Sequence, residues 1–84
     1  MTNEKLRTLL GGNAAFHYTP GVPDDAPLLE EGVVDSFGMI ALVMLIEEQF
    51  GIRIMPEDAT QERFRSIGSI ASYIEAKQNE HPGH

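Results

Sequence analysis

Apolar residues recur at helical spacing in three stretches of the chain, and glycine and proline separate these stretches. The spacing predicts helices over residues 3–10, 36–50 and 66–78. Thr2 is a candidate cap for the first helix, and Gly11 begins the glycine pair that ends it. Ser36 is placed to cap the second helix, and Gly51 supplies a left-handed stop after it. Gly68 weakens the first turn of the last helix by about 1 kcal/mol relative to alanine.

The segment between the first two helices is predicted to be a long loop. Residues 13–35 contain three prolines, which exclude a long regular element. The second half of this loop carries apolar residues that would anchor it: Leu28, Leu29, Val33 and Val34. Pro56 and the acidic residues after it predict a short helix or turn near residues 57–63. With no strand pattern, the sequence predicts an all-α fold, a small three- to four-helix bundle. We expect one domain over residues 1–84, with a flexible tail at 78–84.

The predicted helix over residues 36–50 has two apolar faces. One face gathers Met39, Leu42, Val43, Ile46 and Phe50. Burial of each such side chain is worth roughly 1.5–3 kcal/mol, so this is the predicted core face. The second face begins beside Ser36 and holds Phe37, Ile40, Ala41 and Met44, flanked by Glu47 and Glu48. A central helix can be buried almost all round, so burial of Ile40 stays open, whereas Phe37 and Met44 are predicted to be exposed. We interpret this face as a docking surface whose carboxylates steer basic partners.

Charge is unevenly distributed along the chain. The formal net charge is −7, which argues against nucleic acid backbones and anionic lipids as partners. Between Thr8 and Ile52 there are seven acidic residues and no lysine or arginine, while the remainder balances six acids against six bases. The excess therefore surrounds Ser36 in sequence and favours a basic partner there, although an acidic face kept for solubility would give the same pattern.

Composition excludes several classes of protein. Without cysteine there is no disulfide, thiolate zinc site or thiol nucleophile, and a reducing cytoplasm suits the chain. The longest apolar run, Met39 to Ile46, is far shorter than the roughly 20 residues that span a bilayer, and the N-terminus lacks the apolar stretch of a signal peptide. We therefore expect a soluble, cytoplasmic monomer. No metal site is predicted, and His17, His81 and His84 are assigned no role.

Ser36 is a polar residue at the head of the apolar docking face. An Asp-Ser pair before a helix is most often a cap, and that interpretation stays open. No histidine or lysine lies near it in sequence, and there is no G-x-S-x-G motif. A serine hydroxyl without a base is a poor nucleophile, so any chemistry at Ser36 needs another protein to activate it. The serine would then be a site of modification and not of catalysis. The sequence shows no base, nucleophile pair or ligand cluster that would support a hydrolase or a metal-dependent enzyme.

An ordered set of motifs covers roughly residues 26–76. Its sequence reads LLEEGVVDSFGMIALVMLIEEQFGIRI and, later, RFRSIGSIASYI. The set resembles the acyl carrier proteins and peptidyl carrier domains, which bind phosphopantetheine. The resemblance implies that Ser36 carries 4′-phosphopantetheine, transferred from coenzyme A by a separate magnesium-dependent phosphopantetheinyl transferase, and that Asp35 helps the transferase to recognise the site. It also implies that the thiol of this arm holds an acyl or aminoacyl thioester, and that the second helix docks on partner enzymes.

The departures from the family pattern bear on the subtype. Residues 37–41 are uncharged, whereas fatty-acid carriers usually have acidic residues there, and Val33-Val34 replace the glycines usual in peptidyl carrier domains. The form D-S-x-G is more similar to D-alanyl and other discrete aminoacyl carrier proteins. The resemblance thus implies a non-catalytic carrier that moves an aminoacyl or acyl group from an adenylating ligase to a downstream acceptor enzyme. The alternatives are a fatty-acid or polyketide acyl carrier protein and an unmodified helical adaptor.

Overall fold

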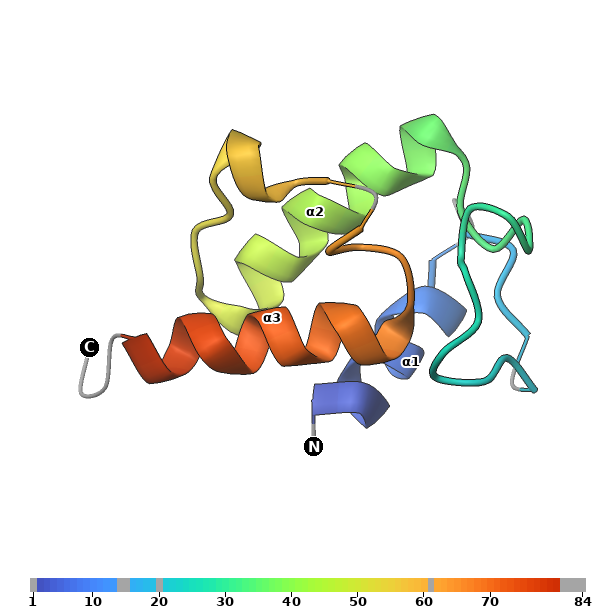
Figure 1. The fold of residues 1–84 in the computed structure, drawn as a ribbon. Helices are drawn as coiled ribbons and strands as arrows, with labels where there is room; N and C mark the ends of the chain where they lie inside the picture. The colour runs from blue at the N-terminus through green and yellow to red at the C-terminus, as the bar shows by residue number, and fades with distance from the viewer. Residues whose placement is uncertain (1, 14–15, 20, 61, 81–84) are drawn as a thin grey trace.

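The computed structural model describes residues 2–13, 16–19, 21–60 and 62–80. In this part of the chain the elements are α1 (Thr2–Gly11), α2 (Ser36–Phe50), the short 3₁₀ helix η1 (Pro56–Asp58) and α3 (Ile67–Glu80). The predicted all-α fold is confirmed, as is the long loop between the first two helices. Figure 1 shows α2 crossing above α3, with α1 below and the long loop at the right, beside the N-terminal ends of α2 and α3.

The core is built from one face of each helix and from the connecting segments. On α2 the buried residues are four apart, Gly38, Leu42 and Ile46, so they form a single line along the helix. Of the predicted core face, Leu42 and Ile46 are fully buried, whereas Met39, Val43 and Phe50 pack against the core but remain partly exposed. The other buried side chains include Leu6 and Leu10 of α1, Phe64, and Ile67, Ile70 and Ile74 on α3.

The long loop packs against the helices through backbone hydrogen bonds and apolar anchors. Leu28, Val33 and Val34 are buried, as predicted for its second half. The Leu28 N–H donates to the Arg65 carbonyl at 2.7 Å, and the Gly68 N–H donates to the Asp24 carbonyl at 2.8 Å. A Cβ on Gly68 would lie 3.3 Å from that carbonyl oxygen, so the glycine permits a close approach. Gly68, which weakens the first turn of α3, thus allows the loop to pack closely against that helix.

The connection from α2 to α3 differs in detail from the prediction. The short helix occupies Pro56–Asp58 and not residues 57–63. It is held on α3 because the Tyr73 hydroxyl donates to Asp58 Oδ2 at 2.9 Å. Ser66 precedes α3 and accepts from the Ser69 N–H at 3.2 Å, so it acts as the cap, and the helix continues past residue 78 to Glu80.

Lys5 of α1 contacts the last turn of α2. Its Nζ donates to the Gln49 carbonyl at 2.9 Å and lies 4.7 Å from the centre of the Phe50 ring. Thr2, the predicted cap of the first helix, is instead part of α1. Among the described residues, every helix is too short or too polar to cross a membrane.

Candidate functional site

Asp35 is the N-cap of α2. Its backbone is extended (φ −103°, ψ −173°), and its Oδ1 accepts a hydrogen bond from the Gly38 N–H at 2.6 Å. The same residue's carbonyl accepts the first helical bond, from the Met39 N–H at 2.8 Å. The prediction that Ser36 caps this helix is therefore wrong. Aspartate and serine are both good N-cap residues. Asp35 occupies the N-cap position, from which its side chain reaches the N–H of Gly38, three residues later.

Ser36 is the first residue of α2, and it is exposed. Because the carboxylate of Asp35 satisfies the Gly38 N–H, no capping bond occupies the serine hydroxyl. That hydroxyl has no hydrogen-bond partner among the residues that the structure describes. A protein that approaches the head of α2 can therefore reach the Ser36 oxygen without breaking a contact of the fold.

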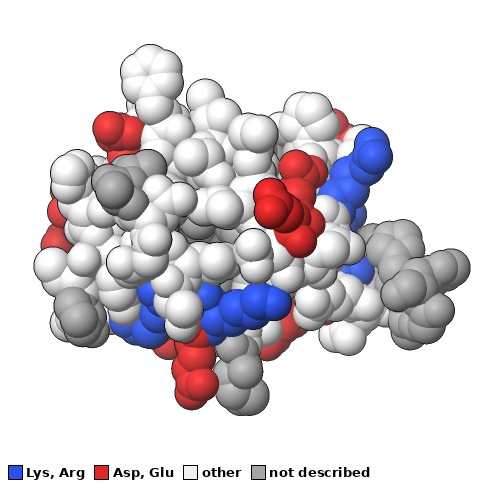
Figure 2. Space-filling view, turned by 180° about the vertical axis from the view of Figure 1, so that it is seen from behind, with Lys and Arg blue, Asp and Glu red and all other residues white. Residues whose placement is uncertain are grey.

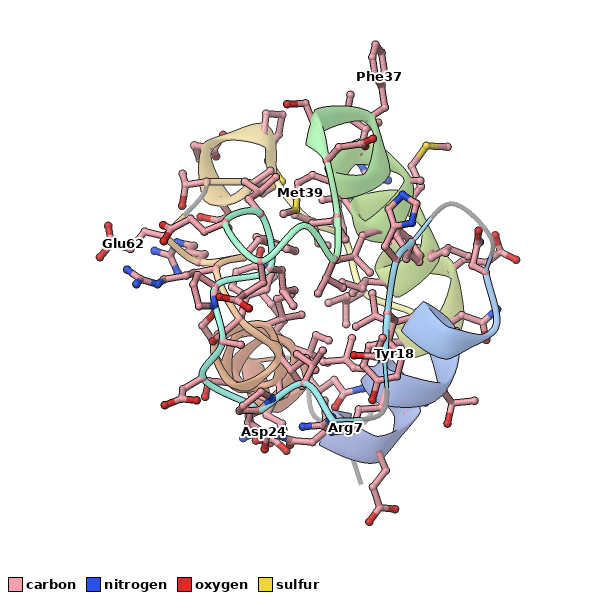
Figure 3. The ribbon with its side chains drawn as sticks, turned by 90° about the vertical axis from the view of Figure 1, so that its right-hand side faces the viewer. Arg7, Tyr18, Asp24, Phe37, Met39 and Glu62 are labelled. Atoms are coloured by element: carbon pink, nitrogen blue, oxygen red, sulfur yellow. The ribbon has the colours of Figure 1, made fainter. Side chains whose placement is uncertain are left out.

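An apolar stripe runs along α2 from the residue that follows Ser36. It consists of Phe37, Ile40 and Met44, whose exposed fractions are 83%, 62% and 64%. These residues are spaced by three and four, so they lie on one face of the helix. In Figure 3 the Phe37 side chain points away from the molecule, whereas Met39 points inward between α2 and η1. Ala41, which the sequence places on the same face, is half-buried and packs against the core.

Most of the chain, including α2, matches a known protein family. The model of the family described as "Phosphopantetheine attachment site" matches residues 4–74. The chain belongs to this family of phosphopantetheine-binding carrier proteins. Its prosthetic group is accordingly 4′-phosphopantetheine, and the carrier is the substrate of a phosphopantetheinyl transferase and not itself an enzyme.

Curated relatives of this carrier protein are bacterial acyl carrier proteins. One from Thermotoga maritima is 38% identical over 56 residues, which is 67% of this chain and 67% of the relative. One from Bdellovibrio bacteriovorus is 36% identical over 56 residues, covering 67% of this chain and 69% of the relative. One from Chlamydia trachomatis serovar D is 34% identical over 55 residues, or 66% and 69% of the two chains.

The head of α2 in this carrier protein fits a phosphodiester on Ser36. The first N–H groups of a helix point beyond its N-terminus and carry partial positive charge, which favours a phosphate there. Asp35 accepts the hydrogen bond of the Gly38 N–H. The backbone N–H groups of Ser36 and Phe37 come before Gly38 in the first turn of α2. An exposed hydroxyl at the first helical position would thus place its phosphate at the positive end of the helix, in water and clear of the core.

The two glutamates at the far end of α2 have different environments. Glu47 is half-buried, and its Oε2 accepts a hydrogen bond from the Ile54 N–H at 2.8 Å. Glu48 is exposed. Glu47 therefore already has a structural contact that fixes the chain after α2, and Glu48 is the more accessible of the pair. Figure 2 shows the rear face, where uncharged side chains predominate over α2 and acidic groups stand among them.

The remaining candidate ligands do not gather into a metal site in the described part of the chain. No group of three or more histidine, cysteine or acidic side chains lies close enough there to hold a metal ion. His17 is exposed, and its backbone N–H donates to the Val33 carbonyl at 2.8 Å. His81 and His84 lie outside the described residues.

Proposed function

We propose that Ser36 is the residue to which the phosphopantetheine of this carrier is attached. The observation that supports the proposal is that Asp35 caps α2. The exposed Ser36 hydroxyl at the start of the helix is therefore not needed for capping. The prosthetic group supplies a thiol, which this cysteine-free chain lacks, and through it a thioester to the cargo. The chain's own part is to present the serine, to keep the helix intact when the group is attached, and to offer a surface to partner enzymes.

Modification of Ser36 is tested by intact mass spectrometry after incubation with coenzyme A, Mg²⁺ and a broad-range phosphopantetheinyl transferase. We expect one phosphopantetheine adduct on the wild-type chain and none on Ser36→Ala. Ser72→Ala is the matched control, because Ser72 is an exposed serine on α3, and it should be modified like the wild type. An adduct that persists in Ser36→Ala would refute the assignment, as would a wild-type chain that remains unmodified.

For partner docking, we propose that Phe37, Ile40 and Met44 form the contact surface beside the attachment site. Three neighbouring apolar side chains that are mostly exposed in the free chain have surface to bury on association. Residues 36–46 carry no charge, so apolar contact would contribute most of the affinity, while Glu48 and the other acids would steer a basic partner toward this face. Weak docking suits a carrier, because affinity differences between related complexes lie mostly in the dissociation rate.

Docking is tested with Phe37→Ala and Met44→Ala. For the enzyme that loads the cargo, with the carrier as its substrate, each substitution should raise the KM several-fold. Their melting temperatures should stay within a few degrees of wild type, because exposed side chains contribute little to folding. Met55→Ala is the control: this methionine is 40% exposed but precedes η1 and lies outside α2. A large drop in melting temperature for either α2 variant, or an equal rise in KM for Met55→Ala, would contradict the docking surface.

For the cargo, we propose an aminoacyl group delivered by an adenylating ligase. This finer assignment rests on the D-S-x-G motif and on the uncharged residues 37–41, which set the chain apart from the pattern usual in fatty-acid carriers. The names of the curated relatives favour a second candidate, an acyl group of the fatty-acid or polyketide type. In both cases an acceptor enzyme takes the cargo from the thioester.

The two cargo classes differ in mass. The carrier is isolated under acidic conditions from the cells that produce it, and its intact mass is measured before and after hydroxylamine, which cleaves thioesters. A labile increment equal to an amino acid residue supports the aminoacyl assignment. A labile long-chain acyl increment refutes it in favour of the acyl candidate, and a chain that carries no phosphopantetheine in those cells supports the unmodified adaptor.

A further inference from the structure

Arg7 of α1 joins three parts of the long loop that precedes Ser36. One of its terminal nitrogens, Nη1, donates to the Tyr18 hydroxyl at 3.0 Å and to the Val22 carbonyl at 2.7 Å. The other, Nη2, forms an ion pair with Asp24. Figure 3 shows these side chains together on the side of the molecule opposite Phe37. The planar guanidinium suits this task, since its five N–H groups can hold several acceptors at once.

The partners of Arg7 are themselves fixed to the helices. Asp24 Oδ2 accepts from Asn3 Nδ2 at 3.1 Å, and the Asp24 carbonyl accepts from the Gly68 N–H at the start of α3. A Cβ on Gly11 would lie 3.4 Å from the Tyr18 ring, so this ring rests on the end of α1. Hydrogen bonds to Tyr18 and then to Asp24 raise the pKa of Arg7. The guanidinium is thus the junction between α1, the loop and α3.

A short chain of contacts leads from this junction to the attachment site. His17, which precedes Tyr18, donates its backbone N–H to the Val33 carbonyl at 2.8 Å. The Val33 N–H in turn donates to the Leu28 carbonyl at 2.9 Å, and Val33 is buried. Two residues further on, Asp35 caps α2 and Ser36 begins it. The segment that Arg7 contacts at Tyr18 is therefore hydrogen-bonded, through His17, to Val33, three residues before Ser36.

We propose that Arg7 is a positioning residue for the phosphopantetheinyl transfer to Ser36. It touches neither the serine nor the prosthetic group, and it acts by holding residues 16–19 and 21–35 in the conformation that the transferase binds. This inference rests on the proposed function of Ser36. When Arg7 is removed, the loop populates other conformations, and the apparent affinity of the transferase falls in proportion to the competent fraction. The turnover of a carrier that has bound in the competent conformation is unchanged.

The test compares Arg7→Met with Lys5→Met. Both remove one cation from α1, but Lys5 is attached to the far end of α2, at Gln49 and Phe50. In steady-state modification with coenzyme A, we expect Arg7→Met to raise the KM for the carrier about tenfold, as a competent fraction of about one tenth would. Its kcat should be unchanged, and Lys5→Met should stay within about twofold of the wild type in both constants. Arg7→Lys, which keeps the charge but not the fork of donors, should raise KM only about threefold.

Amide hydrogen exchange measures the loop independently of modification. We expect about tenfold faster exchange at the backbone N–H groups of His17 and Val33 in Arg7→Met, with exchange at the same two groups unchanged in Lys5→Met. Unchanged loop exchange would overturn the inference, because Arg7 would not hold the loop. Faster loop exchange with an unchanged KM, or an equal KM rise in Lys5→Met, would overturn the positioning role. A wild-type chain that is not modified at Ser36 would refute the proposed function, and the inference with it.

Discussion

The assignment of the α2 cap to Asp35 predicts a loss of stability for one of two adjacent substitutions and almost no change for the other. Loss of an N-cap side chain costs typically about 1 kcal/mol, within a range of roughly 0.5–2 kcal/mol. The bond from the Gly38 N–H to Asp35 is short, at 2.6 Å, so we place Asp35→Ala in the upper half of that range, at about 1–2 kcal/mol. In a domain of this size 1 kcal/mol shifts the melting temperature by roughly 4–8 °C. Asp35→Ala should therefore melt roughly 5–15 °C below the wild type.

Ser36→Ala removes an exposed hydroxyl that takes no part in the cap, so its free energy of unfolding should change by less than about 0.5 kcal/mol. Thermal unfolding followed by circular dichroism, on unmodified protein in one buffer, measures both effects. Asp35→Asn is the control, because asparagine caps as well as aspartate but carries no charge. If Ser36→Ala destabilises the chain as much as Asp35→Ala, or if Asp35→Ala melts with the wild type, the cap assignment is wrong.

The same variants separate capping from recognition by the transferase. Asp35→Asn keeps the helix start and removes the carboxylate charge beside the proposed attachment site. If Asp35 contributes to recognition, as the family resemblance implies, this variant is modified more slowly than the wild type at an unchanged melting temperature. Wild-type kinetics of modification would show that the role of Asp35 is confined to the cap.

Two further predictions concern α2. Leu42→Ala removes a side chain with no exposed surface and should lower the free energy of unfolding by about 2–5 kcal/mol in a denaturant titration, and a loss below 1 kcal/mol would show that the site is not part of the core. Glu47→Ala leaves the Ile54 N–H without its acceptor and should lower the free energy of unfolding by roughly 1–3 kcal/mol. Glu48→Ala should change it by less than about 0.5 kcal/mol. Equal losses in the same titration would contradict the different roles of the two glutamates.

The sequence predicted the three helices well because their signals are local. Apolar spacing identified α1, α2 and α3, and the left-handed Gly51, at φ 65°, ends α2 as expected. The exposure of Phe37 and Met44 also followed from their place opposite the line of Leu42 and Ile46. The starts of α1 and α3 differ from the prediction by one residue. At α2 the start is as predicted but the cap is not, because neighbouring capping residues compete for one position and the sequence does not rank Asp35 against Ser36.

Contacts between distant segments could not be predicted. Gly68 has the sequence signature of a weak helix start, and only the approach of the Asp24 carbonyl explains why a glycine fits there. Glu47 has the pattern of a surface acid, but the return of the chain after α2 brings the Ile54 N–H to its carboxylate. Arg7 reaches Asp24 across 17 positions, and no periodic pattern encodes such a pairing. These residues hold the loop and the connection in place.

The division of roles between Asp35 and Ser36 has a consequence for the modified protein. A serine that capped the helix would lose or distort its hydrogen bond when its oxygen became a phosphodiester, and the first turn of α2 would be weakened in the modified form. Because Asp35 makes that bond, substitution at the Ser36 oxygen breaks no contact among the described residues. The core line through Leu42 and Ile46 faces away from the apolar stripe, so the proposed partner binding at Phe37 and Met44 would likewise leave the fold intact. In the proposed function, attachment, docking and stability would therefore depend on different side chains, and each could be removed by a substitution that leaves the other two intact.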